Sequence, residues 1–400
     1  MRALMLPVHR YVGLALAVFL AIAGITGSLL AWNEELEAAI SPQLFRVTAP
    51  ATATRIDPVL LHAQVAARYP HALAARLPLE FGDGRSVLFS LRPLPKGKPL
   101  PNDQVFVDPY TGQVLGQRKW GDIGQGMKNL MPFIYRLHYS LALDGIGTLV
   151  FGIVALLWTL DCFAGAWLTL PGARVYTHGA RRTWSARWWQ AWKFRSGSAY
   201  KTSFNLHRAG GLWTWSMLFV LAWSSVAFNL PQVYEPAMRA VFAHQPGLES
   251  LPKLARPQLA PALDWRQALP AARRLMAGQA QAGGFAVVAE KSLLYDPTRA
   301  IYRYDVRTSH DIRHKGGHTR LVMDANTGAF KGLWLPTGAA AGDTVSTWMA
   351  TLHMAAMWGW PLQLLVCLMG LAVTLLSVTG VHVWLKKWLT KRRAGRIAAA

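Results

Sequence analysis

Four long stretches of the sequence are almost free of charged side chains. Residues 11–32, 209–233 and 344–385 contain no Asp, Glu, Lys or Arg, and residues 145–170 contain only Asp161. A helix of about 20 consecutive apolar residues crosses the hydrocarbon core of a membrane. Each stretch therefore predicts a transmembrane helix. In the last stretch, Pro361 predicts a division into a short interfacial helix around residues 352–358 and a membrane helix over 362–385.

The composition agrees with a membrane protein, and the basic residues predict its orientation. Hydrophobic residues make up 52% of the chain, charged residues 16%, and the net charge is +22. Segments 171–203 and 387–400 contain Arg and Lys but no acid, and the N-terminus adds Arg2 and Arg10. Basic segments beside membrane helices stay in the cytoplasm. We expect an uncleaved first helix, cytoplasmic termini, and no nucleic-acid partner, since the topology accounts for the charge.

Two copies of one unit follow each other along the chain. The first and third apolar stretches both open with the pattern HRxxGL, at His9 and at His207. Leu-His precedes the second and fourth stretches, at His138 and at His353, and a glycine follows each of these histidines after 27 residues. Because each unit has two spans, both copies enter the membrane in the same direction. This predicts two pseudo-symmetric parallel repeats, related by an axis along the membrane normal.

The segments between the paired spans repeat as well. The pattern DxxTGxxxG begins at Asp108 and again at Asp324. It predicts a β-hairpin turn, because glycine adopts a positive φ without steric cost. A helix is predicted upstream of each turn, with Asp57 near its start in one copy and Asp264 in the other.

Alternating runs at residues 86–91 and 301–306 predict strands in these segments. The predicted fold class is an α-helical membrane protein with four transmembrane helices and two external α+β domains. The expected order is transmembrane helix 1 (1–33), external domain 1 (34–137), transmembrane helix 2 (138–170), a basic cytoplasmic loop (171–203), transmembrane helix 3 (204–233), external domain 2 (234–345), an interfacial helix with transmembrane helix 4 (346–386), and a basic cytoplasmic tail (387–400).

Five of the 12 histidines lie at the ends of the predicted membrane helices. His138 and His353 lie near the outer face, and His9, His207 and His382 near the cytoplasmic face. Imidazole nitrogens bind iron, copper and zinc. The repeat places His138 opposite His353 and His9 opposite His207, so each pair is a candidate set of axial haem ligands. A lone histidine at a helix end is more often an interfacial polar residue, and His382 is an alternative ligand for the inner site.

A haem held by two histidines has no open coordination position, which favours electron transfer over oxygen chemistry. One haem near each face would divide the barrier of about 30 Å into shorter electron-transfer steps. Asp161 is a charged side chain within a span and hence a functional candidate, although structural pairing is the expected role. The two cysteines lie in predicted spans and form no CxxCH motif, so no covalent c-type haem is expected.

A group of histidines and basic residues lies in the second external segment. His310, His314 and His318 recur at every fourth position, beside Arg313 and Lys315. On a helix this spacing would form a metal-binding face. The Gly-Gly pair inside the group predicts a hairpin loop instead. We interpret it either as a solvated basic loop or as a surface that attracts an anionic or metal-chelate substrate to the outer haem.

The HRxxGL openings, the Leu-His pairs and the external domains ending in DxxTG resemble the PepSY-associated transmembrane proteins of bacteria over nearly the whole chain. Within that family the pattern is most similar to the ferric-siderophore reductases of the ferrioxamine type. The resemblance implies a cytoplasmic-membrane protein with two periplasmic PepSY-like domains and two b-type haems. It also implies a membrane-bound oxidoreductase that reduces Fe(III) held by a siderophore in the periplasm and releases Fe(II).

The electron donor has to be a separate partner, since no GxGxxG motif marks a dinucleotide site. Either a cytoplasmic reductase that docks on the basic loop or a membrane quinol would serve. Two other functions remain open from the sequence. One is a haem-bearing membrane subunit for another periplasmic reductase. The other is a non-redox membrane protein whose PepSY-like domains bind a peptidase.

Overall fold

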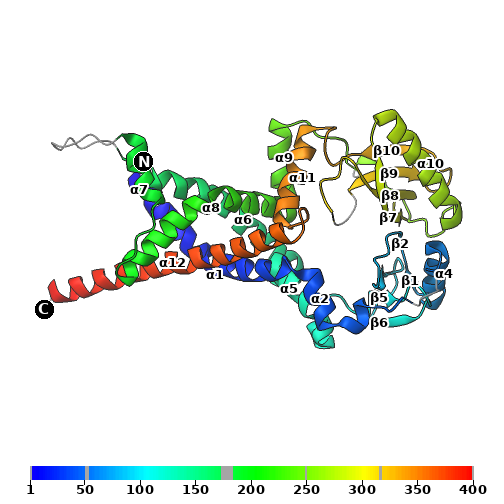
Figure 1. The fold of residues 1–400 in the computed structure, drawn as a ribbon, viewed down its shortest axis with the longest axis horizontal. Helices are drawn as coiled ribbons and strands as arrows, with labels where there is room; N and C mark the ends of the chain where they lie inside the picture. The colour runs from blue at the N-terminus through cyan, green and yellow to red at the C-terminus, as the bar shows by residue number, and fades with distance from the viewer. Residues whose placement is uncertain (1, 50–53, 173–182, 248–249, 315–317, 399–400) are drawn as a thin grey trace.

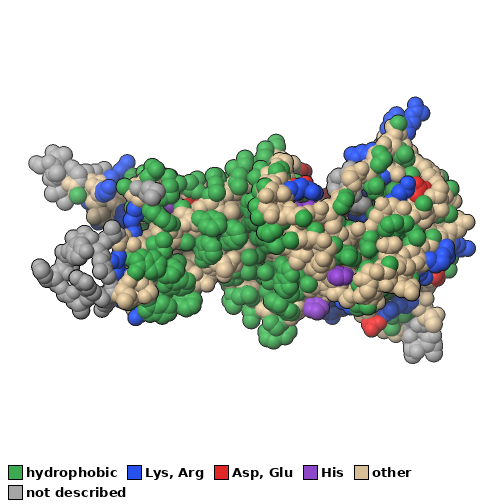
Figure 2. Space-filling model, turned by 90° about the horizontal axis from the view of Figure 1, so that it is seen from above, with side chains coloured by type: hydrophobic (Ala, Val, Ile, Leu, Met, Phe, Trp, Pro, Cys, Tyr) green, Lys and Arg blue, Asp and Glu red, His purple; other side chains and the backbone are tan. Residues whose placement is uncertain are grey.

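A computed structural model describes residues 2–49, 54–172, 183–247, 250–314 and 318–398. Four helices in these ranges are long and apolar enough to cross a membrane. They are α1 (Arg2–Leu30), α6 (Asp144–Thr169), α8 (Ala199–Asn229) and α12 (Trp360–Ala398). Apolar side chains face outward from them, with Val18 68% and Ile146 76% exposed. On the face seen in Figure 2, hydrophobic side chains cover much of the surface of the helices. A soluble protein rarely exposes such a surface, so the chain is a multi-pass membrane protein.

The four long helices form a bundle in which α1 and α8 each pack against both α6 and α12. The helices α1 and α12 approach closely where Gly24 faces Gly370. A Cβ atom on Gly24 would lie 2.4 Å from the carbonyl oxygen of Gly370, so only glycine allows this contact. The Ser28 hydroxyl donates to the Cys367 carbonyl across the same interface at 2.8 Å. Small residues and hydroxyl hydrogen bonds are the usual means by which membrane helices associate.

The bundle has two unlike ends (Figure 1). We call the end where α1 begins and α12 ends the terminal end. The helix α7 (Trp184–Trp192) lies there. We call the opposite end, from which the sheets extend, the domain end. It carries the short helices α2 (Asn33–Ile40), α3 (Pro42–Phe45), α5 (Leu130–Ser140), α9 (Pro231–Val241) and α11 (Ala341–His353), and the turns η1 (Ile123–Gln125) and η2 (Met127–Asn129).

A separate short helix precedes α6 and another precedes α12. Leu141 ends α5 in the left-handed region, with φ 53°. The prediction of an interfacial helix over 352–358 is wrong, because α11 ends at His353 and a turn with positive φ at Ala355 and Trp358 follows. Pro361 lies in the first turn of α12, where its missing N–H costs no hydrogen bond.

The first external domain packs α4 (Pro58–Arg68) on a three-stranded antiparallel sheet of order β3-β5-β6. Its strands are β3 (Val87–Ser90), β5 (Gln104–Val107) and β6 (Val114–Arg118), and β1 (Ala72–Leu73) pairs separately with β4 (Arg92–Pro93). Asp57 caps α4 by accepting from Val59 N and Leu60 N. The predicted turn at Asp108 joins β5 to β6, with Gly112 at φ 73°. These predictions are confirmed.

The second external domain packs α10 (Trp265–Gly283) on β7 (Val287–Asp296), β8 (Ile301–Thr308), β9 (Thr319–Asp324) and β10 (Phe330–Trp334). Asp264 and Gln267 form a capping box at the start of α10. The predicted turn at Asp324 joins β9 to β10, with Gly328 at φ 72°. The helix and the hairpin are confirmed. The core between α10 and the sheet includes Leu293, Tyr302, Tyr304, Leu321 and Met323.

The two external domains share a sheet. Strand β2 (Arg76–Pro78) of the first domain pairs with β7, which gives a five-stranded antiparallel sheet of order β10-β9-β8-β7-β2. Leu77 of β2 is fully buried in the core of the second domain. Lys291 of β7 forms an ion pair with Glu80, just after β2. The boundary predicted between two separate external domains therefore does not describe their packing.

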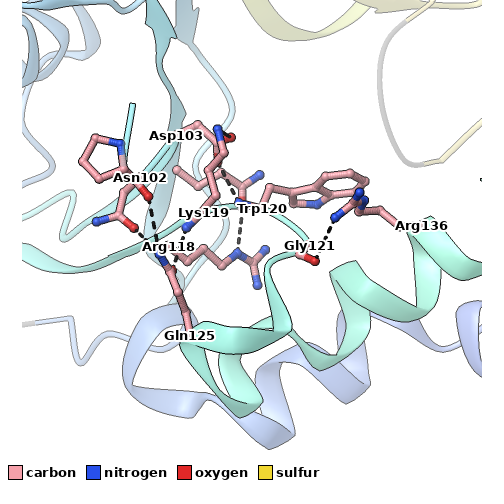
Figure 3. Close-up of polar contacts among 10 residues, drawn as sticks. Asn102, Asp103, Arg118, Lys119, Trp120, Gly121, Gln125 and Arg136 are labelled. Carbon is pink, nitrogen blue, oxygen red and sulfur yellow. Dashed lines mark hydrogen bonds and ion pairs between the residues drawn. The ribbon is translucent and has the colours of Figure 1, made fainter. Parts of the chain in front are cut away.

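A polar network ties the first external domain to α5. The Arg118 side chain, 2% exposed, pairs with Glu37 and donates to the Lys128 carbonyl at 2.7 Å. From α5, Arg136 donates to the Gly121 carbonyl at 3.3 Å. Figure 3 shows this contact beside Trp120, whose backbone N–H donates to Asp103. The domain thus fixes the position of α5, which carries His138.

Candidate metal centres

His138 and His353 meet at the domain end of the bundle, and we call them the domain pair. His138 lies in the last turn of α5 and His353 is the last residue of α11. Their ring centroids are 6.3 Å apart, with an angle of 83° between the ring planes. The two histidines that the sequence repeat matches are thus brought together.

A hydroxyl group from a long helix holds each ring of the domain pair. Nδ1 of His138 lies 2.9 Å from Oγ1 of Thr26, and Nδ1 of His353 lies 2.6 Å from Oγ of Ser224. Both hydroxyls already donate their single proton to a carbonyl of their own helix, Thr26 to Ile22 at 2.6 Å and Ser224 to Val220 at 2.5 Å. Each hydroxyl must therefore accept from the histidine. Both rings carry the proton on Nδ1 and leave the lone pair of Nε2 free.

His9 of α1 and His207 of α8 meet near the terminal end, and we call them the terminal pair. Their ring centroids are 6.1 Å apart. Nδ1 of His9 lies 2.8 Å from Oδ1 of Asp161, and Nδ1 of His207 lies 2.9 Å from the Leu376 carbonyl oxygen. Carboxylate and carbonyl oxygens only accept, so both Nδ1 atoms are donors. The terminal pair presents Nε2 lone pairs in the same way as the domain pair.

The spacing in both pairs is that of two imidazoles on opposite sides of one metal ion. Two metal–nitrogen bonds of about 2.0 Å, plus about 1.1 Å from each nitrogen to its ring centre, separate the centroids by about 6 Å. The contacts of these four rings with Thr26, Ser224, Asp161 and the Leu376 carbonyl are all made through Nδ1, on the far side of each ring from Nε2. A metal-bound histidine ordinarily donates its other N–H to a protein acceptor, as all four do here.

A glycine lies under three of the four rings. A Cβ atom on Gly27, Gly165 or Gly380 would approach Cε1 of His138, His9 or His207, respectively, to 3.1 Å. Such a contact is tighter than an ordinary van der Waals contact, so a side chain there would displace the ring. Gly165 and Gly380 are the glycines that follow His138 and His353 after 27 residues. The glycines of this repeated spacing therefore lie against the terminal pair, and not against the histidines of the domain pair from which the spacing is counted.

The terminal pair lines a cavity of about 890 Å³ between the four long helices. Its walls are mostly apolar and include the tryptophans Trp158, Trp215, Trp384 and Trp388. Asp161 is the acid in this lining. The lining also contains the basic residues Arg2, Arg10, Arg208, Lys387 and Lys391. Pockets of this size and character hold cofactors.

His382 is placed differently from the terminal pair. Its Nδ1 lies 2.7 Å from Oγ of Ser203, one turn before His207 on α8. Its neighbours Val381 and Val383 line the cavity, whereas His382 is not part of that lining. The geometry therefore favours His9 and His207 over His382 as the matched pair. The structural pairing expected for Asp161 is observed, and its partner, which the sequence did not indicate, is the ring of His9.

The basic loop of the second external domain joins β8 to β9 as a hairpin, as predicted. Lys315 lies outside the described residues. Arg313 donates from Nε to Oγ1 of Thr351 at 3.2 Å, and the His314 N–H donates to the Ala356 carbonyl at 3.0 Å. His310 packs its ring against Phe285 in the second domain. The loop thus contacts the chain on both sides of His353.

Arg313 and His318 of this loop are partly buried and bonded to each other. A guanidinium N–H of Arg313 donates to Nε2 of His318. Burial, and then the charge of Arg313, lower the pKa of His318 to about 4. His318 is therefore neutral at pH 7, and a fully solvated loop does not describe these two residues.

Within the described residues, no group of three or more His, Cys, Asp or Glu side chains could hold a metal ion. The candidate centres are pairs, which a macrocyclic ligand would complete. Sequence reasoning missed the hydroxyl partners Thr26 and Ser224. The repeat contained a signal for them, because a hydroxyl residue follows both His9 and His207 after 17 positions.

No curated protein matches the chain. A family model described as the PepSY-associated TM region matches residues 6–387. This match includes all four long helices, both external domains and both histidine pairs. The chain is a member of the PepSY-associated TM region family.

Proposed function

We propose that the protein is a di-haem transmembrane oxidoreductase that reduces Fe(III)-siderophore complexes in the periplasm and releases Fe(II). The observation that carries the proposal is the pair of equivalent centres, with ring centroids 6.3 Å and 6.1 Å apart and every Nδ1 fixed as a donor. His138 with His353, and His9 with His207, would be the residues that hold a haem at each end of the bundle. Two-histidine centres at both ends of a bundle favour electron transfer across it.

The residues around the terminal pair fit a haem. The apolar walls and tryptophans of the cavity suit a porphyrin, and its basic residues supply cations for two propionate groups. Gly165 and Gly380 leave the space that keeps His9 and His207 facing each other. For the domain pair, His138 and His353 would hold the haem, and Thr26 and Ser224 would fix the orientation of their rings. When bound, a haem at each pair supplies reversible one-electron transfer.

The orientation that we propose is that of the positive-inside rule. The terminal end, with Lys387 and Lys391, then lies in the cytoplasm of a bacterium, and the domain end with both sheets lies in the periplasm. The two external domains are PepSY-like, and the two halves of the chain are parallel repeats. Electrons enter at the terminal pair from a cytoplasmic reductase or a membrane quinol and leave at the domain pair.

The basic loop supports a substrate position beside the domain pair. His310, Arg313, His314, Lys315 and His318 form this loop, and its described part contacts Thr351 and Ala356 on either side of His353. An Fe(III) chelate that rests on the loop takes one electron and becomes the Fe(II) chelate. Hydroxamate and catecholate oxygens hold the softer Fe(II) less tightly, so the metal is released without cleavage of the ligand.

The test is a spectrum followed by a titration. The full-length protein, purified in detergent after expression with ample haem, should show a Soret band and sharp α and β bands on reduction with dithionite. Anaerobic addition of an Fe(III) chelate should reoxidise the haem and yield Fe(II), trapped by a ferrous indicator. A protein without haem would overturn the redox function and leave the peptidase-binding alternative. A haem protein that no Fe(III) chelate reoxidises would instead be a subunit of another periplasmic reductase.

A further inference from the structure

The pattern HRxxGL, which occurs in α1 and again in α8, lines the cavity of the terminal pair in both copies. In the first copy the lining residues are His9, Arg10, Gly13 and Leu14, and the four equivalent residues of α8 belong to the lining as well. The histidines are the proposed haem ligands. The same pattern also brings one arginine from each of the two helices to the cavity.

The glycines of the pattern widen the cavity beside the two rings. Gly13 and Gly211 lie four residues after His9 and His207, so each glycine is on the same helix face as its histidine. A Cβ atom at either glycine would have no neighbouring atom within 4 Å. A close contact between helices therefore does not account for these glycines, whereas room for a large planar ligand does.

Arg208 is a partly buried cation whose contacts are with neutral groups. Its guanidinium donates to the Gln190 carbonyl at 3.2 Å and to Oδ1 of Asn205 at 2.8 Å, and it lies over the Phe204 ring. Arg195 donates to the side-chain oxygen of the same Gln190, so the nearby charge is also positive. The Nε atom of Arg208 is buried and has no hydrogen-bond partner in the described part of the chain. A buried donor without a protein acceptor is unusual and requires an explanation.

Acidic side chains are scarce in this part of the molecule. Asp161 is the single acid within residues 1–33, 145–234 and 344–400, which include all four long helices beyond their first residues. Its carboxylate already accepts from Nδ1 of His9 at 2.8 Å. The cations at the terminal end therefore outnumber the acids there, and a ligand that carries carboxylates would supply the missing negative charge.

Two of the five cations in the cavity lining are best placed to bind such a ligand. Arg2 is exposed and donates to two backbone carbonyls at the end of α6 at 2.8 Å. Lys387 and Lys391 are exposed on α12. Arg10 and Arg208, in contrast, are partly buried and directly follow the two histidines of the terminal pair.

We propose that Arg10 and Arg208 each hold one of the two propionate groups of a haem at the terminal pair, so that HRxxGL is a haem-binding pattern in both copies. This inference rests on the proposed function. The two propionates of a haem lie on one edge of the ring, and the pattern supplies one arginine for each. Guanidinium groups bind carboxylates through paired N–H donors. Because Arg208 reaches Gln190 of α7, the propionate edge faces the terminal end.

The test uses a haem whose propionates are esterified. The full-length His138→Ala protein, which should retain the terminal centre alone, is reconstituted in detergent with protohaem or with protohaem dimethyl ester. Dissociation of each haem into excess apomyoglobin is then timed. The ester should dissociate at least about ten-fold faster, because it forms no charge-assisted hydrogen bonds with the arginines. After the further double substitution Arg10→Gln/Arg208→Gln, the two haems should dissociate at rates within two-fold of each other.

The matched control is Lys201→Gln, which removes an exposed charge of α8 outside the cavity lining. It should preserve the difference between the two haems. A double variant that only loosened the helices would release both haems faster and would also preserve this difference. That result, or equal release of both haems before the arginines are replaced, would overturn Arg10 and Arg208 as the residues that hold the propionates.

The same proteins distinguish a failure of this inference from a failure of the proposed function. If the arginines discriminate between the haems as expected but no Fe(III) chelate reoxidises the reduced wild-type protein, the haem site stands and the reductase function fails. If a chelate does reoxidise the wild-type protein but the double variant still discriminates, the function stands and the assignment of the arginines fails. A protein that binds neither haem overturns both.

Discussion

The domain pair and the terminal pair hold their rings at nearly the same separation, 6.3 Å and 6.1 Å, but through different acceptors. The domain pair rests on two neutral hydroxyls, Thr26 and Ser224. The terminal pair rests on a backbone carbonyl and on the carboxylate of Asp161. Under the proposed function, the similar ring separation suits the same cofactor at both pairs, and the different acceptors would give the two centres different reduction potentials.

A carboxylate that accepts from a ligating histidine makes the imidazole a stronger electron donor and so favours the oxidised metal. Under the proposed function, the terminal centre then has the lower reduction potential. An electron delivered at the terminal end would move spontaneously toward the domain end. The asymmetry between two otherwise equivalent pairs would thus direct the electron outward.

The largest expected effect comes from removing a ring. His353→Ala or His138→Ala should halve the haem content and abolish reduction of Fe(III) chelates, because the remaining histidine cannot complete the centre. His9→Ala or His207→Ala should halve it in the same way but spare the other centre. Haem content per protein and the low-temperature α band report this. His382→Ala is the control and should retain both haems. Loss of a haem in this variant would mean that His382 is a ligand in place of His9 or His207.

Replacing the carboxylate should shift one midpoint potential only. Asp161→Asn should raise the potential of the terminal centre by tens of millivolts, where about 59 mV corresponds to a tenfold change in a one-electron equilibrium. Spectroelectrochemical titration separates the two centres. Asp83→Asn, which removes an exposed carboxylate from the first external domain, is the control and should leave both potentials near their wild-type values. Two unchanged potentials in Asp161→Asn would remove the electronic difference between the pairs.

Replacing a glycine that lies against a histidine ring by alanine should weaken haem binding at that histidine pair. Gly27→Ala brings a Cβ atom to 3.1 Å from the ring of His138, and Gly165→Ala does the same to His9. Overpacking costs about 1 kcal/mol or more, or at least about five-fold in haem affinity. Haem transfer to apomyoglobin should be faster from the domain centre in the first variant and from the terminal centre in the second. Gly145→Ala, on a long helix outside the cavity lining and with nothing within 4 Å of the added Cβ, is the matched control.

The smallest effect should come from removing the hydroxyl group of Thr26. Thr26→Val leaves the Nδ1–H of His138 without its acceptor, at a cost of about 1 kcal/mol. Thr26→Ser keeps the hydroxyl and should restore wild-type behaviour. The domain centre alone should respond, through a small shift of its midpoint potential. A response of the terminal centre to Thr26→Val would show that the two pairs are not independent.

Much of this arrangement could be predicted from the sequence. Charge-free runs of membrane length predict the long helices, and the repeat matches His9 with His207 and His138 with His353. These predictions succeed because each depends on many residues: about 20 apolar residues mark a membrane helix, and the repeat matches several motifs at once. The capped helices and hairpin turns of the external domains were predictable because Asp and Gly act locally there.

Other features had no local signal. Leu141 and Ala355 take positive φ without being glycine, so the breaks before α6 and α12 could not be located by turn chemistry. Strand β2 is three residues long, and nothing in residues 76–78 indicates a partner more than 200 positions away. The acceptors Thr26 and Ser224 look like ordinary hydroxyls within apolar helices until the histidines are placed beside them.

The strand shared by the two domains also bears on how the chain can be made. Residues 76–78 are synthesised more than 200 residues before β7. The first domain can therefore fold before β7 is made and then offer β2 for pairing. A fragment that contains only the second unit would present β7 as an open edge, and exposed edges recruit other chains into aggregates. Pro78, which cannot donate a ladder hydrogen bond, ends the sheet at β2. The second unit is therefore expected to aggregate when it is expressed without residues 76–78 of the first.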